Sequence, residues 1–347
     1  MRGVRLRLSV AIGAIASALL LPAGALAQQD APAPEPVAAP NPATPADAER
    51  ASADKAPKPA RIDLELKGVD GGRVEVGDRI TAIGTVAPFV GGQRVEIRLG
   101  NKGKTMLKKT PLVRRVKGKN YGRFHLRSKP LIEAGKYRVR VRKAATGAQA
   151  GGAAKSKEFA LTFPDLDPGD GGPAVEVFND LLRKRGYFNT DNGSYGSHTE
   201  RAVMAYRKVN GMDRNFQATP GIFAALAAGK GSFELAYPNQ GKHTEVDISK
   251  QVMALADDGK VKYVFHVSTG AAATPSDPGG FTYYRKDAGF NSLGMYYSVY
   301  YNRGEATHGY HSVPPYPASH GCIRNPIPDS IFIYNWIDLG DKMFVYN

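Results

Sequence analysis

Between residues 61 and 163, apolar and polar side chains alternate in short runs that end at glycine-rich turns. The clearest runs are Ile62–Leu66, Arg94–Leu99 and Tyr137–Val141. Alternation with a period of two puts successive side chains on opposite faces of a β-strand. Glycine pairs at 71–72 and 91–92 supply the turns between them. About a hundred residues with this pattern predict a β-sandwich over 61–163.

A second pattern begins after the turn-rich segment Pro164–Gly172. Apolar residues then recur with helical spacing, which predicts a small helical module over 170–230. Ser197 or Thr199 is expected to cap the second helix of this module. The two apolar helix faces comprise Val175, Phe178, Leu181 and Leu182, and then Ala202, Val203 and Tyr206.

Residues 231–347 read as a β-rich domain. Asp257–Lys260 has the composition of a hairpin turn. His243 and His266 lie in or beside expected strands, and we interpret both as structural. The expected strands are Phe233–Tyr237, Thr244–Ile248, Lys262–Val267, Met295–Tyr301 and Lys342–Tyr346, with a helix near Ser330–Ile337.

The N-terminus has the pattern of a signal peptide over 1–27. Three arginines precede the uncharged run Leu8–Leu21, and Ala25-Leu26-Ala27 offers a cleavage site. Fourteen residues span only about 21 Å as a helix, short of the roughly 30 Å hydrocarbon core. Residues 28–60 are rich in Ala and Pro and lack aromatic side chains, which predicts a disordered linker. We therefore expect an exported, extracytoplasmic protein.

Positive charge is concentrated in residues 91–143. This segment holds eighteen Lys or Arg against Glu96 and Glu133, a surplus of sixteen within a chain whose net charge is +15. The alternation places Arg94, Arg98, Arg138, Arg140 and Arg142 on outward faces. In an exported protein the expected partners are anionic wall polymers or a membrane surface, and no nucleic acid.

The only cysteine of the chain lies in an unusual setting. Cys322 has three of the seven histidines within fifteen positions, namely His308, His311 and His320. A thiol attacks carbonyls as its thiolate, so a nucleophilic cysteine needs a base or cation nearby. The alternatives are a buried apolar cysteine and a zinc site made by Cys322 and these histidines. Since a second cysteine is absent from the sequence, acyl transfer is favoured and neither a metal nor an organic cofactor is expected.

This segment resembles the active-site motif of the L,D-transpeptidases, the family with the YkuD catalytic domain. The resemblance covers roughly Ser232 to Asn347. Only ten residues separate His308 from Ser319, fewer than in many members, so His311 competes with His308 for the role of base. The matching residues are His308-Gly309 and the run Ser319-His320-Gly321-Cys322-Ile323-Arg324.

The resemblance implies acyl transfer on peptidoglycan stem peptides. Cys322, deprotonated by His308, would form an acyl-thioester and release D-alanine, and the amine of a second stem would then attack. His320 and Gly321 would shape the oxyanion site, and Ser319 would orient a histidine or support the turn. Arg324, His311 and Gly309 would contact substrate. A hydrolase that uses water as acceptor, or a non-catalytic wall-binding protein, remains possible on the same residues.

Two further resemblances concern the upstream modules. The order of turns in 61–163 looks like bacterial immunoglobulin-like modules, although the Cys pair and core Trp of antibody domains are absent from the sequence. Residues 186–203 resemble three-helix peptidoglycan-binding modules, but Asn179 and Arg207 stand where those modules usually have Gln. The chain is thus expected to be multidomain and mainly β. Whether the helical module binds glycan or acts as a spacer is left open by the sequence.

Overall fold

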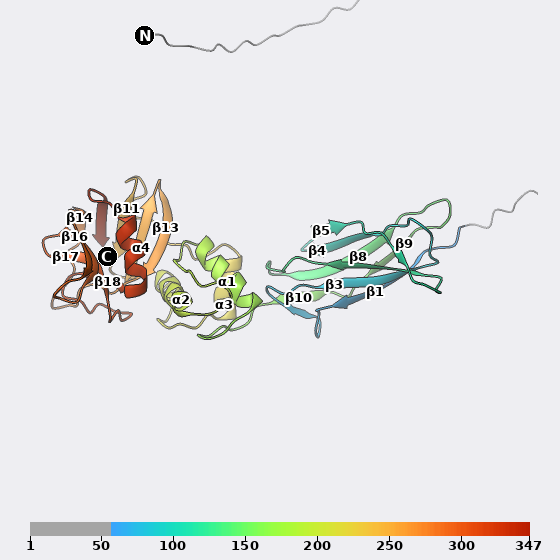
Figure 1. The fold of residues 1–347 in the computed structure, drawn as a ribbon, viewed down its shortest axis with the longest axis horizontal. Helices are drawn as coiled ribbons and strands as arrows, with labels where there is room; N and C mark the ends of the chain where they lie inside the picture. Colours follow the sequence, from blue (N-terminus) through green and yellow to red (C-terminus); the bar gives the residue numbers. More distant parts are fainter. Residues whose placement is uncertain (1–56) are drawn as a thin grey trace, which may run out of the picture. The chain divides into compact units, whose positions relative to one another are not determined.

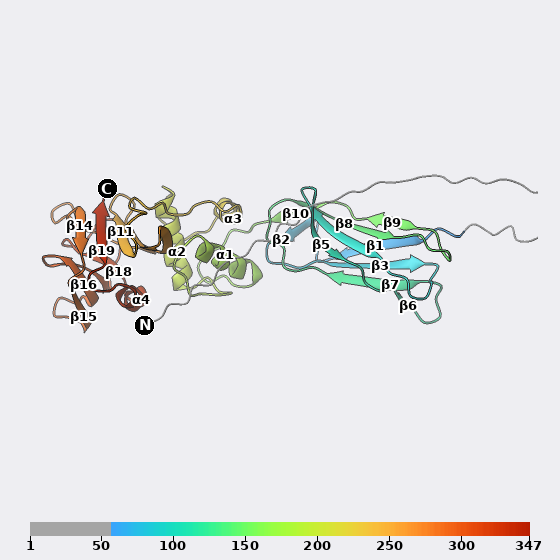
Figure 2. The same cartoon turned by 90° about the horizontal axis from the view of Figure 1, so that it is seen from above.

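The computed structural model describes residues 57–347 (Figures 1 and 2). The predicted signal peptide and nearly all of the predicted linker lie outside these residues. Within the described part of the chain, the structure contains no helix with the length and apolar character needed to cross a bilayer. The described elements are mainly strands, which confirms the predicted fold class.

The first described region is built from two sheets, as the alternation predicted. Strand β8 shows how the pattern works, because Tyr137, Val139 and Val141 are buried while Lys136, Arg140 and Arg142 are exposed. One sheet has the order β1 (Arg61–Lys67), β3 (Thr81–Ala87), β7 (Gly122–Arg127), β6 (Arg114–Arg115). The other has the order β2 (Arg73–Glu75), β10 (Phe159–Thr162), β8 (Lys136–Lys143), β4 (Glu96–Asn101), β5 (Lys104–Lys109), with β9 (Gly152–Lys155) paired to β8. The immunoglobulin-like assignment stays a prediction.

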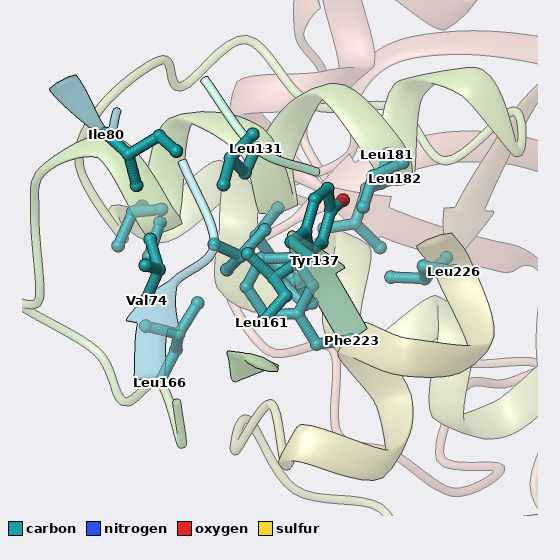
Figure 3. Close-up of a cluster of buried hydrophobic side chains, with 14 of the residues drawn as sticks. Val74, Ile80, Leu131, Tyr137, Leu161, Leu166, Leu181, Leu182, Phe223 and Leu226 are labelled. Atoms are coloured by element: carbon teal, nitrogen blue, oxygen red, sulfur yellow. The ribbon is translucent and has the colours of Figure 1, made fainter. Parts of the chain in front are cut away.

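Three helices follow: α1 (Pro173–Lys184), α2 (Ser197–Val209) and α3 (Pro220–Ala227). Figure 3 shows apolar residues that α1 and α3 contribute to a buried cluster, among them Leu181, Leu182, Phe223 and Leu226. The expected capping of α2 by Ser197 or Thr199 is wrong, because its N-cap is Gly196. The Thr199 N–H instead donates to Asp191 Oδ2 at 2.9 Å, and the Thr199 hydroxyl donates to Asn179 Oδ1.

The C-terminal region contains two sheets and one helix. The turn at Asp258-Gly259 joins two strands as predicted, and both residues have positive φ, of 50° and 68°. The five-stranded sheet has the order β13 (Lys260–His266), β12 (Val252–Asp257), β11 (His243–Asp247), β19 (Lys342–Tyr346), β14 (Gly279–Thr282). The four-stranded sheet has the order β15 (Arg285–Phe290), β16 (Tyr296–Asn302), β17 (Glu305–Tyr310), β18 (Ile323–Pro326), and α4 (Ile327–Trp336) follows it.

The expected strand at Phe233–Tyr237 is absent. A buried carboxylate takes the place of a partner strand, because Glu245 accepts hydrogen bonds from the Ala236 and Tyr237 N–H groups at 2.9 and 2.7 Å. The Tyr237 ring also stacks on Phe344, with centroids 4.2 Å apart. These side-chain contacts fix the segment without a ladder of backbone hydrogen bonds.

Candidate active site

Two neighbouring parallel strands bring the motif residues together. Strands β17 and β18 pair so that His308 lies opposite Arg324, while Thr307 lies opposite Ile323. Cys322 directly precedes β18, two residues before Arg324. Because side chains two residues apart in a strand point to the same face, Cys322 is expected beside the face that carries His308 and Arg324. The sheet register therefore brings Cys322 and His308 close together although fourteen positions separate them in the sequence.

The hydrogen bonding of His308 defines its tautomer. Its Nδ1 lies 2.9 Å from the Gly309 carbonyl oxygen, which can only accept, so Nδ1 carries the proton. Nε2 is then left with a free lone pair. Burial and, to a smaller extent, the Arg324 charge lower the pKa of His308 to about 4. His308 is therefore neutral at pH 7 and suited to accept a proton.

Cys322 is half-buried, and burial raises the pKa of its thiol. A hydrogen bond from the Ala306 backbone opposes this effect, and the Glu305 carboxylate adds to it. The Sγ atom also lies 3.8 Å from the Gly304 carbonyl oxygen. Because burial raises the pKa of the Cys322 thiol and lowers that of His308, the resting site holds a protonated Cys322 thiol and a neutral His308 imidazole.

The turn before Cys322 is fixed by Ser319 and Gly321. Ser319 is buried, and its hydroxyl donates to the Cys322 carbonyl at 2.5 Å and accepts from the Gly321 N–H at 3.2 Å. Gly321 has φ +116°, and a Cβ atom there would lie 3.0 Å from Glu305 Oε1. The Ser319 hydroxyl therefore supports the turn, and within residues 57–347 it forms no hydrogen bond with a histidine ring.

The remaining residues predicted for the site differ from one another in burial and contacts. His311 and His320 are exposed. Arg324 lies over the Tyr310 ring, 4.2 Å from its centroid. Gly309 is buried, and a Cβ atom there would lie only 2.1 Å from the Ser330 hydroxyl, which makes it a close-packing position. Within residues 57–347, the structure gathers no three His, Cys, Asp or Glu side chains that could hold a metal ion, so the zinc alternative gains no support.

Sequence reasoning missed two residues beside Cys322. Glu305 follows the tip of the β16–β17 hairpin, where it accepts from the Asp277 N–H at 3.1 Å and from the Asn302 side chain at 3.2 Å. Tyr301 is 3% exposed, and burial, then the charges of Glu305 and Cys322, raise its pKa. No spacing in the sequence indicates either residue, because the hairpin and the β17–β18 pairing create the proximity. His243 and His266 are both buried and hydrogen-bonded, as expected for structural residues.

Comparison with known proteins bears on this site. Residues 241–345 match the family model of the L,D-transpeptidase catalytic domain, YkuD. A search of curated proteins found no match.

Several solved structures are similar to the chain. An L,D-transpeptidase (residues 123–326) from Xylanimonas cellulosilytica DSM 15894 is 29% identical over 53% of this chain and 98% of its own, with a TM-score of 0.49. An L,D-transpeptidase from Stackebrandtia nassauensis is 23% identical over 54% of this chain and 97% of its own, with a TM-score of 0.33. An L,D-transpeptidase from Mycobacterium smegmatis is 11% identical over 83% of this chain and 100% of its own, with a TM-score of 0.28.

These TM-scores are low, so the assignment depends on the family match and not on the structural similarity. The match includes every residue of the Cys322 and His308 motifs. Residues 241–345 are therefore an L,D-transpeptidase catalytic domain of the YkuD family, and the chain is an enzyme.

Proposed function

We propose that this protein is an exported L,D-transpeptidase that cross-links or remodels peptidoglycan through an acyl-thioester on Cys322. The main support is the pairing of β17 with β18, which aligns His308 and Arg324 next to Cys322. Export is proposed from the signal-peptide pattern of residues 1–27 and the linker that follows it.

Acylation begins with Cys322 as a neutral thiol and His308 as a neutral imidazole. As the Cys322 sulfur attacks the carbonyl of a stem residue that precedes D-alanine, His308 Nε2 takes the thiol proton. A covalent C–S bond forms, the bond to D-alanine breaks, and His308 returns the proton to the departing amine. Because Nδ1 is held by the Gly309 carbonyl, the imidazole keeps its orientation through both transfers.

Deacylation transfers the acyl group to the acceptor. A side-chain amine of a second stem attacks the thioester carbonyl, and His308 takes a proton from the amine. As the C–S bond breaks, His308 returns this proton to the sulfur, which regenerates the Cys322 thiol and the neutral imidazole. A hydrolase would use the same residues with water as the acceptor. Incubating the purified enzyme with defined stem tetrapeptides and reading the products by mass separates these outcomes: dimers support the transpeptidase, tripeptides alone support the hydrolase, and no product supports a non-catalytic wall-binding protein.

The pH dependence of acylation follows from His308. The base acts in its neutral form, which predominates above its pKa of about 4 and is lost as the pH falls through that value. We expect kcat/KM for D-alanine release to decline on the acid side with an apparent pKa near 4. Thermal unfolding at the same pH values controls for loss of the fold. An acid limb near the ordinary histidine pKa of about 6.5 would contradict the neutral pair.

We also propose that the outer face of β4, β8 and β9 binds an anionic wall polymer. Arg140 lies opposite Arg98 on one side and opposite Lys155 on the other, and all three are exposed. Like charges directly opposite each other destabilise a sheet, so the stability of the fold does not explain why Arg98, Arg140 and Lys155 lie side by side. Within residues 57–347, no ion pair involves Arg140 or Lys155, whereas Glu96 pairs with Arg98 at 2.6 Å.

The shape of this face favours a polymer over a bilayer. A hollow of about 550 Å³ is lined by four cationic side chains, Arg98, Arg140, Arg142 and Lys155, and by one carboxylate, Glu96. A second hollow of about 580 Å³ shares Arg98 and Arg140, adds Lys102, Lys104, Lys136 and Arg138, and also has one carboxylate, Glu158. Connected concave sites suit a linear chain of phosphates or carboxylates, while a bilayer presents a flat array of charge.

Charge reversal tests this proposal. We expect the triple change Arg98→Glu, Arg140→Glu and Lys155→Glu to weaken binding of the full chain to isolated walls by ~10²-fold, given about 1 kcal/mol for each charge near an anionic surface. Binding should also fall between 0.1 and 1 M salt, where the Debye length shrinks from about 10 to 3 Å.

The matched control reverses three exposed charges at the other sheet, namely Arg114 and Arg115 of β6 and Lys119 in the connection between β6 and β7. Equal loss in both triple variants would indicate a general basic surface. Binding to anionic vesicles but not to walls would indicate a membrane partner. Binding that is insensitive to salt would remove the electrostatic explanation.

A further inference from the structure

Helix α2 presents cationic side chains to the catalytic domain. Arg201 and Lys208 are seven residues apart and therefore share one face of the helix. Arg201 forms a two-pronged ion pair with Asp329 of α4, with both N···O distances 2.9 Å. Next to this face, Phe188 packs against Phe265 and Phe332, with centroids 4.9 and 4.5 Å apart. The helical module thus has an extensive interface with the domain that carries Cys322.

Lys208 is 3% exposed and is surrounded by acceptors of the catalytic domain. Its Nζ lies 2.9 Å from the Gln251 and Val267 carbonyl oxygens and 2.6 Å from His266 Nδ1. His266 Nε2 must donate to the Val313 carbonyl at 2.9 Å, so in the neutral ring Nδ1 accepts. Burial lowers the pKa of Lys208, yet three acceptors require three N–H donors, and we assign it as an ammonium.

Arg214 lies beyond the end of α2 and forms a second link. Its guanidinium donates to the Pro315 carbonyl and, at 3.2 Å, to the Ser249 carbonyl. Val313 and Pro315 belong to residues 311–318, which we name the active-site loop because it connects the strand of His308 to the turn before Cys322. The helical module therefore contacts this loop directly through Arg214 and indirectly, through His266, from Lys208.

A second set of hydrogen bonds leads from Lys208 to the C-terminal end of the active-site loop. The Gln251 side chain donates to the Thr269 hydroxyl at 2.6 Å and accepts from the Thr269 N–H at 2.9 Å. The Thr269 carbonyl accepts from the Ala318 and Ser319 N–H groups at 2.9 and 3.0 Å. Ser319 in turn donates to the Cys322 carbonyl. These hydrogen bonds join buried or partly buried groups, and they connect Gln251, which Lys208 contacts, to Ala318 at the end of the active-site loop.

We propose that Lys208 and Arg214 are positioning residues that hold the active-site loop in its catalytic shape, and that the helical module is a working part of the transpeptidase. A passive spacer does not require one cation that contacts the loop and a second that reaches it through His266. In the sequence the loop joins the strand of His308 to the turn before Cys322, so we expect a change in its shape to affect how a stem peptide binds. Losing either cation is expected to make the loop more mobile and to weaken binding of the donor stem peptide, without changing Cys322 or His308.

The variants Lys208→Met and Arg214→Gln test this in the full chain. We expect faster hydrogen–deuterium exchange at the amides of 311–318 and a KM for a donor tetrapeptide that rises by roughly fivefold to tenfold. Alkylation of Cys322 by iodoacetamide, normalised to the folded fraction, should keep its wild-type rate, because a small reagent does not use the loop. Arg214→Lys should restore most of the KM, since an ammonium can also donate to the Pro315 carbonyl.

The matched control is the double variant Arg201→Gln with Asp329→Asn, which removes an ion pair from the same interface without touching the loop. It should lower the unfolding temperature and leave both KM and loop exchange unchanged. The proposal is overturned if Lys208→Met and Arg214→Gln leave loop exchange and KM unchanged, or if the control raises KM equally. Exchange does not depend on turnover, so a wild-type enzyme that releases no D-alanine would count against the proposed function alone.

Discussion

Replacing Cys322 by alanine is expected to abolish acyl-thioester formation and to lower D-alanine release by at least about 10⁴-fold. The sulfur forms the covalent bond to substrate, and the chain has no second cysteine to replace it. Intact-mass measurement of the enzyme after incubation with a donor tetrapeptide detects the adduct, and D-alanine release gives the rate.

The fold should survive this change. Cys322 is only half-buried, so we expect the free energy of unfolding to change by less than about 1 kcal/mol. Cys322→Ser provides a second variant of nearly equal size. If Cys322→Ala still releases D-alanine at a rate near that of the wild type, the assignment of the nucleophile is wrong.

The second large effect is expected at His308. Removing a general base costs roughly 10² to 10⁴ in rate, so His308→Ala should lower kcat for acylation by that amount. Its neutral state and free Nε2 are the physical basis, since both suit proton transfer from the Cys322 thiol. Single-turnover measurement of adduct formation isolates this step from deacylation.

His311 and His320 are the matched controls, because both are exposed histidines of the same segment. Alanine at either position should lower the rate less than His308→Ala does. The competing assignment, in which the short spacing after His308 moves the base to His311, predicts the reverse order. An inactive His311→Ala beside an active His308→Ala would establish that alternative.

The sequence predicts best where one local pattern dominates. The final strand Lys342–Tyr346 has the predicted bounds, and the Asp257–Lys260 turn joins two strands. In both cases short-range rules suffice, because period-two alternation and a turn with positive φ need no knowledge of distant partners. The contact between Cys322 and the strand of His308 was instead implied by the resemblance of the motif to the L,D-transpeptidases.

The sequence misleads where contacts between distant parts of the chain decide the structure. Phe233–Tyr237 has the alternation of a strand, but the Glu245 carboxylate takes the N–H groups that a strand would pair. Lys208 is not among the residues that helical spacing places on the apolar face of α2, yet it is buried against the backbone carbonyls of Gln251 and Val267, more than forty positions away. Glu305 reaches the site only because a hairpin turns back beside Cys322. Such groups are defined by what surrounds them in space, which hydrophobic periodicity does not encode.

The protonated resting state of Cys322 also bears on its chemical durability. Peroxides oxidise thiolates far faster than thiols, so a thiol whose pKa is raised by burial and by Glu305 resists conversion to sulfenic acid. With no second cysteine in the sequence, a sulfenic acid has no resolving partner within the chain and is open to irreversible over-oxidation. The environment that delays the formation of the nucleophile until substrate is present thus also preserves it between turnovers.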